Sequence, residues 1–413
     1  MNSSGVWHAQ HAWLGQVAEN VLIDVHDGRI TKVTEGMPRP AEAIDLRGFT
    51  VPGFANAHSH AFQIALRGKT QEVDGDFWEW RKKMYELAAI LTPDSMHKLA
   101  LEAYREMANA GITAVGEFHY VHHRPDGGRY DDPNAMGAAL IAAASEVGIR
   151  ITLIDACYLY GGLGKKPLEG AQVRFGDGDA ASWANRVEVL KDSPGVRIGA
   201  AIHSVRAVDP LAMRAISAFA RIKNRPLHLH LAEQPAEVEE CMHAFEVTPT
   251  MLCSREEVLG AGTTAVHAIE LNKDDVVLLG RYGTHVCVCP TTERDLGDHV
   301  GPTKALADHG AALCLGSDSN AVIDLFEEAR GVELDQRRAI GKRGLHKPAE
   351  LLGAATRGGM QSLGWDAGEL AAGRLADFVT VRLEDPDPSR LIFASSARDV
   401  INVVVGGRTI VKV

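Results

Sequence analysis

From residue 51 to residue 60 the chain reads Val51-Pro-Gly-Phe-Ala-Asn-Ala-His-Ser-His60. A short apolar run bounded by Pro-Gly is typical of a buried β-strand, and this one ends in two histidines spaced two residues apart. Since alternate side chains of a strand point to the same face, His58 and His60 are directed to one side, as a shared metal ion requires. Taken alone, the pair is equally compatible with a structural or surface role, but its place at a strand end favours a metal site.

The same pattern, a short apolar run ending in polar residues and followed by a stretch with helical spacing, recurs between Thr50 and Asp318. Strands that alternate with helices predict a parallel sheet, and about eight such units close a (β/α)8 barrel of the TIM type. The predicted strands run into Asn56–His58, Glu117–His119, Asp155–Cys157, His203–Ser204, His230–Glu233, His267–Ala268, Cys289–Thr291 and Gly316–Asp318. Because barrel enzymes build their sites at the carboxyl ends of strands, these polar residues are expected at one common mouth.

Capping residues mark the helices between the strands. Thr92-Pro93-Asp94 predicts the start of a helix that ends at Gly111, and Asp209-Pro210 predicts the start of another. The apolar face predicted for the second helix consists of Leu211, Ala215, Ala218, Phe219 and Ile222.

The two chain ends differ from the region between them. Both contain short β-rich runs, such as Val21–Val25 near the N-terminus and Val400–Val405 near the C-terminus. Neither end is large enough to form a core alone, so we expect them to pair into one small β-sandwich beside the barrel. The predicted organisation is a sandwich from residues 1–50 and 369–413 and a metal-dependent barrel from residues 51–368.

Composition and charge exclude several classes of protein. The 413 residues are 46% hydrophobic and 23% charged, as in a globular enzyme, and the formal net charge is −11. Without basic runs, such a chain is not expected to bind nucleic acid or a membrane surface, and an anionic substrate would have to be captured by specific arginines. No segment approaches membrane-spanning length, and Met1–Gln10 lacks the pattern of a secretory signal. The six cysteines are scattered and do not form a disulfide framework, so a cytoplasmic protein is expected. Cys287 and Cys289 are expected to pack in the core.

The fifth predicted strand carries a second histidine motif, His228-Leu-His230-Leu-Ala-Glu233. His228 points to the same side as His230 and is the rival ligand. We choose His230 because it lies nearer the strand end. Glu233, three residues later, is expected to reach the substrate, whereas a histidine satisfied in the barrel core is the alternative interpretation.

Asp318 completes a candidate ligand set with His58, His60 and His230. Three neutral imidazoles and one carboxylate suit one Zn²⁺ ion, or Fe²⁺, and leave a position for a water whose pKa falls toward about 7. Asp318 can also accept a proton from that water, and His267 is placed to hydrogen-bond the water or the developing tetrahedral centre.

Other metal arrangements are not found in the sequence. It has no His-Glu-x-x-His helix and no Pro-Cys-x-x-Cys motif, and residues 199–204, at the fourth strand end, contain no lysine that could bridge two ions. A single ion is therefore expected.

Together these motifs resemble the amidohydrolase superfamily, in its single-metal deaminase branch, over nearly the whole chain. Within that branch the sequence is similar to the formimidoylglutamate deiminases. The likeness rests on Phe54–Gln63, Glu117–His123, His203–Arg206, Cys289–Glu293 and Gly316–Asn320. The first and last stretches are partly shared by the superfamily, and the middle three are more selective.

The resemblance implies metal-dependent deimination of N-formimino-L-glutamate to N-formyl-L-glutamate and ammonia, in histidine degradation, by a homodimer. Glu233 would pass a proton to the leaving nitrogen, because an amidine nitrogen departs readily only when protonated. The small anionic amidine substrate carries two carboxylates, which forked cationic donors recognise well. The substrate-binding set carried over from the resemblance is Gln63, Arg81, Tyr120, His203 and Arg206.

Several of these assignments have alternatives. Arg81 could equally belong to a solvated helix face, Tyr120 could be a packing aromatic, and His122 and His123 are either extra donors or loop residues. Asn320 stands where the resemblance leads us to expect histidine, which leaves the identity of the substrate open.

Two other functions compete with deimination of formiminoglutamate. A deaminase of an aminopyrimidine, guanine or adenosine-type base would share every metal ligand and differ only in the pocket. A non-catalytic scaffold that has lost its ion would be expected to show decayed ligands, whereas all four are present here.

Overall fold

The computed structural model describes residues 4–70 and 77–413, and its centre is one sheet of eight parallel strands in the order β12-β11-β10-β9-β8-β7-β6-β5. The strands are β5 (Phe54–Ser59), β6 (Ile112–His119), β7 (Arg150–Cys157), β8 (Val196–Ile202), β9 (Leu227–Leu231), β10 (Thr263–His267), β11 (His285–Val288) and β12 (Ala312–Leu315). The edge strands meet where the Asp318 amide donates to the His58 carbonyl at 3.0 Å and the His60 amide donates to the Asp318 carbonyl at 2.9 Å. The sheet is thereby closed, and the predicted (β/α)8 barrel is confirmed.

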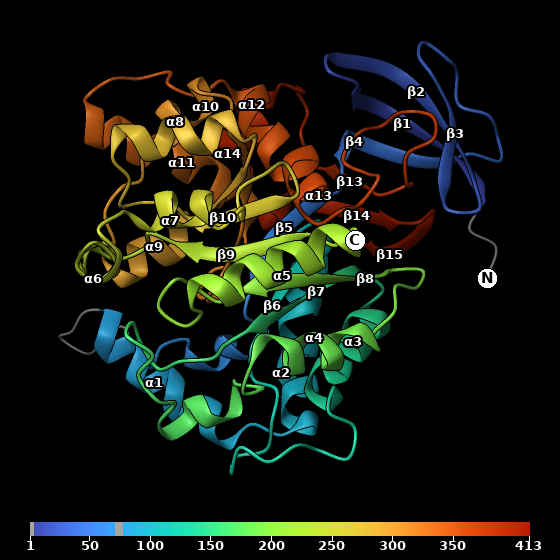
Figure 1. Cartoon of the computed structure of the whole chain (residues 1–413). Helices are drawn as coiled ribbons and strands as arrows, with labels where there is room; N and C mark the ends of the chain where they lie inside the picture. Colours follow the sequence, from blue (N-terminus) through green and yellow to red (C-terminus); the bar gives the residue numbers. More distant parts are fainter. Residues whose placement is uncertain (1–3, 71–76) are drawn as a thin grey trace.

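Helices surround the barrel (Figure 1). They are α1 (Phe77–Ile90), α2 (Pro93–Asn109), α3 (Ala135–Val147), α4 (Ala180–Glu188), α5 (Pro210–Ile222), α6 (Pro235–Phe245), α7 (Pro249–Arg255), α8 (Lys273–Arg281), α9 (Pro290–Leu296), α10 (Thr303–Asp308), α11 (Leu325–Ile340), α12 (Pro348–Gly353), α13 (Gly359–Ser362) and α14 (Pro388–Ala394). Thr92 caps α2 by accepting a hydrogen bond from the Ser95 amide at 3.3 Å, so this helix begins where the sequence predicts.

Helix α5 begins at Pro210 as predicted, but the prediction of its buried face was wrong. Leu211 and Ile222 are 77% and 80% exposed, and the buried face instead includes Ala212, Met213, Ile216 and Ala220. Both sets of residues have helical spacing, so periodicity alone does not choose between them. The buried face carries small residues, which allow the helix to lie close to the strands.

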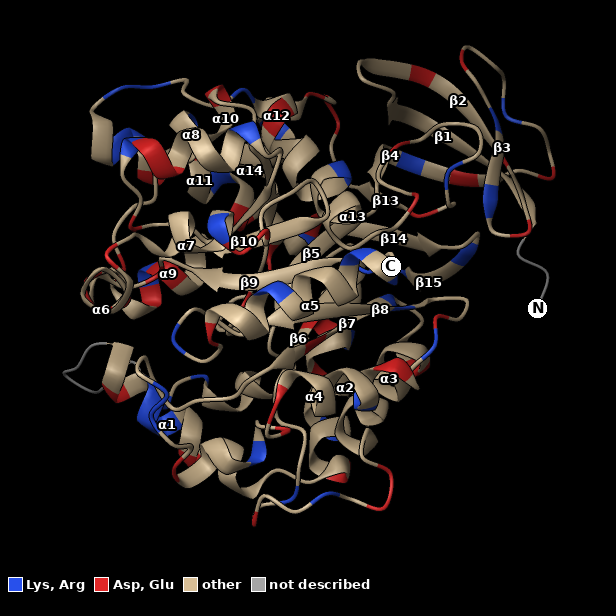
Figure 2. Cartoon of the chain, in the orientation of Figure 1, with Lys and Arg blue, Asp and Glu red and all other residues tan. Residues whose placement is uncertain are grey.

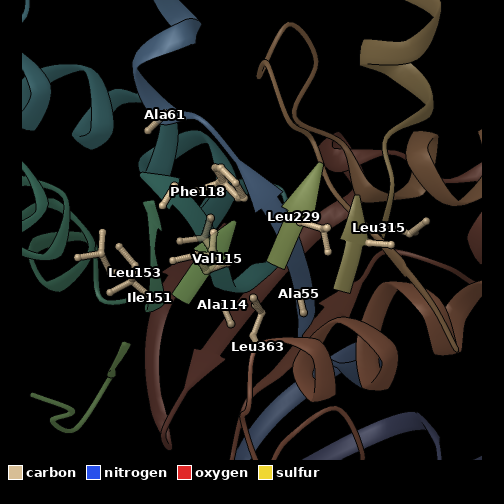
Figure 3. Close-up of a cluster of buried hydrophobic side chains, with 14 of the residues drawn as sticks. Ala55, Ala61, Ala114, Val115, Phe118, Ile151, Leu153, Leu229, Leu315 and Leu363 are labelled. Atoms are coloured by element: carbon tan, nitrogen blue, oxygen red, sulfur yellow. The ribbon is translucent and has the colours of Figure 1, made fainter. Parts of the chain in front are cut away.

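The main core fills the space between the strands and the helices (Figure 3). Branched apolar side chains from neighbouring strands are fully buried there, among them Val115, Ile151, Leu153, Leu229 and Leu315. The cysteines at 287, 289 and 314 form a separate buried cluster with Ala57 and Val266. The expectation that Cys287 and Cys289 pack in the core is confirmed.

Both chain ends form a second sheet, in the order β15-β14-β13-β4-β1-β2-β3. Its strands are β1 (Gly5–Trp13), β2 (Val17–His26), β3 (Arg29–Thr34), β4 (Ile44–Pro52), β13 (Phe378–Val381), β14 (Val400–Val405) and β15 (Arg408–Lys412). Strand β4 pairs in parallel with β1 and antiparallel with β13, so blue and red segments lie side by side in Figure 1. The predicted pairing of the two ends is confirmed; residues 1–3 of the predicted first segment lie outside the described residues.

A buried ion pair joins this small sheet to the barrel. Arg150, at the start of β7, donates to both carboxylate oxygens of Asp377 at 2.6 and 2.9 Å, and Asp377 also accepts from the Gly406 amide at 2.7 Å. The bidentate geometry fixes the orientation of one unit on the other, because both carboxylate oxygens and two guanidinium nitrogens are used at once.

Charged residues of both signs are interspersed along the chain (Figure 2). This distribution matches the absence of basic runs in the sequence. Among the described residues, no helix combines the length and the apolar character needed to cross a membrane.

Candidate active site

Four side chains from three strand ends converge at the mouth of the barrel. His58 lies on β5 and His60 directly follows it, His230 lies on β9, and Asp318 follows β12. The Nε2 atom of His58 lies 3.2 Å from Nε2 of His230 and 3.3 Å from Oδ1 of Asp318, and Nε2 of His60 lies 3.4 Å from the same oxygen. The structure therefore brings together the four residues predicted as metal ligands.

Hydrogen bonds fix the tautomers of two of these histidines. The Nδ1 atom of His60 donates to the Phe118 carbonyl at 2.9 Å, and Nδ1 of His230 donates to the His203 carbonyl at 3.0 Å. Because a carbonyl oxygen can only accept, the proton of each ring is on Nδ1 and the lone pair is on Nε2. Both Nε2 lone pairs point into the same small space.

The charge state of the cluster fits a divalent cation. Burial lowers the pKa of His58 and His230 and lowers that of His60 to about 3, so these imidazoles are neutral. Burial alone would raise the pKa of Asp318, but its hydrogen bond with His58 holds that pKa below its usual range. Without a cation, the Nε2 lone pairs of His60 and His230 would lie within 4.8 Å of each other, and that of His60 would lie 3.4 Å from a carboxylate oxygen. An N₃O set of this kind is typical of Zn²⁺ or Fe²⁺ sites.

The other histidine clusters fit an ion less well. His228, the rival ligand, donates from Nε2 to the Ser362 carbonyl at 3.0 Å and is not part of the converging set. His119, His122 and Asp155 also approach one another, but both Asp155 oxygens accept from Arg186 at 2.8 Å. A guanidinium thus already supplies the positive charge there.

His267 lies beside the metal-ligand cluster among three carboxylates. Its Nε2 atom is 3.7 Å from Oε1 of Glu233 and 3.8 Å from Oδ2 of Asp318, and its Nδ1 atom is 3.3 Å from Oε1 of Glu293. Burial lowers the pKa of His267, but the charge of Glu233 and the hydrogen bond with Glu293 raise it well above the ordinary value. These contacts place the imidazole of His267 next to the space where substrate would react.

Glu293 has a role that the sequence reasoning missed. Its Oε1 atom accepts from the Cys289 amide at 2.9 Å as well as contacting His267, so one carboxylate caps α9 and orients the imidazole. The available signal was its place in the Cys289–Glu293 stretch, five residues after the end of β11 at Val288.

Strained backbone is concentrated at the strand ends that form the site. Left-handed φ values occur at five non-glycine residues after β9, β10 and β12: Ala232 (50°), His267 (70°), Ala268 (53°), Asp318 (43°) and Asn320 (57°). Side chains other than glycine rarely adopt this conformation, and such strain is typically concentrated at functional sites.

Asn320 ties two strand ends together. Its side-chain amide donates to the Ser59 hydroxyl and to the His60 carbonyl, each at 3.1 Å, and its oxygen accepts from the Ser317 hydroxyl at 2.6 Å. The side chain is fully buried and does not line the cavity described next. Its effect on a substrate is therefore indirect, through the loops that carry His60 and Asp318.

A cavity of ≈ 280 Å³ opens next to the metal-ligand cluster. Every residue of the predicted substrate-binding set lies on its wall: Gln63, Arg81, Tyr120, His203 and Arg206. The sequence reasoning missed much of the aromatic wall, which includes Trp78, Tyr85, Tyr158 and Phe175. These residues come from α1 and from loops whose position depends on the tertiary fold.

The two arginines of the cavity have different surroundings. Arg81 packs over the rings of Trp78 and Tyr85, at 4.5 and 5.3 Å, and no carboxylate within residues 4–70 and 77–413 pairs with it. Arg206 lies between two acids, with Nη2 at 3.3 Å from Oε2 of Glu233 and Nε at 3.3 Å from Oε2 of Glu237. The cavity therefore has one guanidinium free to meet an anion and one that already has internal partners.

Neutral polar groups complete the cavity. Gln63 donates from Nε2 to the Tyr120 hydroxyl at 3.3 Å, and its buried Oε1 atom has no hydrogen-bond partner among the described residues. Burial lowers the pKa of His203, so this imidazole is neutral. His122 and His123 are buried elsewhere and do not line the cavity.

Comparison with known proteins agrees with this architecture. The model of the amidohydrolase family matches residues 49–410. The chain is 36% identical to a formimidoylglutamate deiminase of Pseudomonas aeruginosa, with 96% of this chain and 92% of the relative covered, and 29% identical to an 8-oxoguanine deaminase of the same organism, with 93% and 88% covered. The crystal structure of an amidohydrolase from Brucella melitensis superposes with a TM-score of 0.93 at 31% identity and covers 99% of this chain and 95% of that one. The chain therefore belongs to the amidohydrolase family and is a hydrolase that acts on C–N bonds.

Proposed function

We propose that the protein hydrolyses N-formimino-L-glutamate to N-formyl-L-glutamate and ammonia. The observation that carries the proposal is the guanidinium of Arg81, which faces the cavity without a carboxylate partner in the described part of the chain. A guanidinium that pairs with no carboxylate of the described residues, on a wall with several aromatic side chains, favours a substrate with a carboxylate. The 36% identity to a formimidoylglutamate deiminase supports the same substrate.

The ligand set and its neighbours supply the groups that the reaction needs. A divalent ion held by His58, His60, His230 and Asp318, Zn²⁺ in our proposal, would lower the pKa of a water toward about 7. Hydrolysis then requires a group that removes a proton from the water and another that delivers a proton to the departing nitrogen.

We assign these tasks to the acids around the cavity. Asp318 accepts one proton of the attacking water, and Glu233, whose Oε1 is 3.7 Å from Nε2 of His267, transfers the other proton to the amidine nitrogen. When Asp318 returns its proton, both water hydrogens are on that nitrogen, the C–N bond breaks as the C=O bond forms, and ammonia leaves. His267, whose Nε2 lies 3.8 Å from Oδ2 of Asp318, donates a hydrogen bond to the oxygen of the tetrahedral carbon. The carboxylates of the glutamate body bind to Arg81 and Arg206, with Gln63, Tyr120 and His203 as neutral hydrogen-bond partners.

Deamination of a purine or pyrimidine base is the second candidate, and the aromatic wall favours it. Tyr120 and Tyr158 both lie edge-on to Phe175, with ring centroids 5.0 and 5.3 Å apart, and a flat base stacks well on such residues. A base, however, carries no carboxylate that could pair with Arg81.

A substrate panel separates the two candidates. Ammonia release is measured from N-formimino-L-glutamate, N-formimino-L-aspartate, cytosine, guanine and adenosine, and the metal content of the purified protein is determined in parallel. We expect turnover of N-formimino-L-glutamate with the highest kcat/KM. Turnover of a base together with no reaction of the formimino compounds would overturn the proposal.

A further inference from the structure

Glu237, on α6, is a buried acid that the proposed mechanism does not use. Its side chain is 0% exposed and does not line the cavity. One carboxylate oxygen, Oε1, accepts from the Ala232 amide at 2.9 Å. The other, Oε2, lies 3.3 Å from Nε of Arg206, and neither of these two atoms has a hydrogen-bond partner among the described residues. Oε2 and Arg206 Nε are therefore each other's electrostatic partner.

Arg206 is consequently held from two sides. Its Nε edge faces Glu237, behind the cavity wall, whereas its Nη2 atom faces Glu233, on the wall. Burial lowers the pKa of Arg206, but the charges of Glu237 and then Glu233 raise it, so the guanidinium stays ionised. A guanidinium has donors on separate edges, so it can keep one anion while it exchanges another.

In the proposed function, Glu233 has two roles that conflict: it is a counter-ion of Arg206 and it transfers a proton. As long as Glu233 is a counter-ion of Arg206, its Oε2 atom is occupied, and a substrate carboxylate that approaches Arg206 competes with it. If Glu233 were the sole partner, its departure would leave Arg206 buried with no fixed orientation, at a large cost in free energy. Glu237 removes this conflict, because it remains in place when Glu233 leaves.

We propose that Glu237 is a positioning residue that anchors Arg206, so that a substrate carboxylate can replace Glu233 on the guanidinium and release Glu233 for proton transfer. The inference rests on the proposed function. A second contact serves the same purpose: Glu237 holds the amide of Ala232, whose left-handed φ of 50° immediately precedes Glu233. One buried acid thus positions both the residue that binds the carboxylate and the residue that moves the proton.

Glu237→Gln tests the proposal, because glutamine keeps the size of the side chain and an oxygen for the Ala232 amide but removes the charge. We expect kcat/KM for N-formimino-L-glutamate to fall about tenfold, the effect of an ordinary coupling between contacting residues. Glu239→Gln, at an exposed position of the same helix, is the matched control and should leave kcat/KM unchanged. Thermal melting verifies that each variant is folded.

A double-mutant cycle with Arg206→Met separates positioning from a general structural role. If Glu237 acts through Arg206, Glu237→Gln should change kcat/KM less than twofold in the Arg206→Met background. If the two losses multiply, or if Glu237→Gln alone has no effect, the inference is overturned. Should Glu237→Gln not fold, Glu237→Asp, which keeps the charge but withdraws it from Arg206, takes its place in the cycle. Absence of wild-type turnover of N-formimino-L-glutamate would instead refute the proposed function, so the two failures are distinguishable.

Discussion

Replacement of Arg81 by methionine removes a positive charge from the cavity wall and keeps an apolar side chain to pack on Trp78. A hydrogen bond from a charged donor contributes about 1.5–3 kcal/mol, which corresponds to about a 10- to 150-fold rise in KM for N-formimino-L-glutamate. Because no described carboxylate pairs with Arg81, the substitution leaves no anion without its partner, and the folded state should lose only the cation–π contact, about 0.5–1 kcal/mol.

Steady-state kinetics with ammonia detection measures this effect. Lys82→Met, at the adjacent exposed position of α1 and outside the cavity wall, is the control for a general loss of positive charge. We expect KM to rise in Arg81→Met alone, with kcat changed much less. An unchanged KM in Arg81→Met, or an equal rise in Lys82→Met, would refute the argument that Arg81 binds a carboxylate of the substrate.

Three further substitutions test the chemistry, the geometry and the charge states of the site. Glu233→Gln should lower kcat by about 10²–10⁴ and leave the metal content unchanged, because it removes a proton carrier and not a ligand; a loss of bound metal would contradict this role. Gly316→Ala should lower both metal content and stability, the latter by about 1–3 kcal/mol, because the new Cβ would lie 2.8 Å from Cβ of His58. Gly353→Ala, in α12 with nothing within 4 Å, should lower neither. Burial lowers the pKa of His228 from 6.5 to about 3, so below pH 6.5 the unfolded chain binds a proton at His228 that the folded chain does not. As the pH falls, this difference lowers the free energy of unfolding by about 1.4 kcal/mol per pH unit. His228→Gln should therefore show a shallower decline in melting temperature between pH 6.5 and 4 than the wild type, and equal slopes would contradict this account.

The elements that sequence predicted well are those with a local signal. Each barrel strand is a short, largely apolar run with polar residues at its end or within three residues after it. The period-two geometry of a strand directs His58 and His60 to the same side without reference to the rest of the fold. The choice of His230 over His228 also followed from position along one strand. Convergence of the four candidate ligands needed only the rule that parallel strands end at the same mouth.

The features that sequence did not predict depend on contacts between distant segments. Leu211 and Ile222 have helical spacing as good as that of the buried residues of α5, and only the position of the helix on the barrel decides which face is covered. Glu237 looks like one of several acids on α6 until Arg206, from the end of another strand, is placed beside it. Asn320 shows the same limit, because its contacts with Ser59 and the His60 carbonyl span about 260 residues of chain.

The contact between the first and last barrel strands, β5 and β12, determines when the ligand set is completed during biosynthesis. His58 and His60 leave the ribosome long before Asp318, and the hydrogen bonds that place these residues side by side form only when β12 closes against β5. A nascent chain that contains only the first seven barrel strands still lacks the candidate ligand Asp318. It also lacks the hydrogen bonds from Asn320 to Ser59 and to the His60 carbonyl. If the four residues hold an ion as we propose, its high-affinity capture would be a late event, and loading of the metal would report that the whole barrel has been completed.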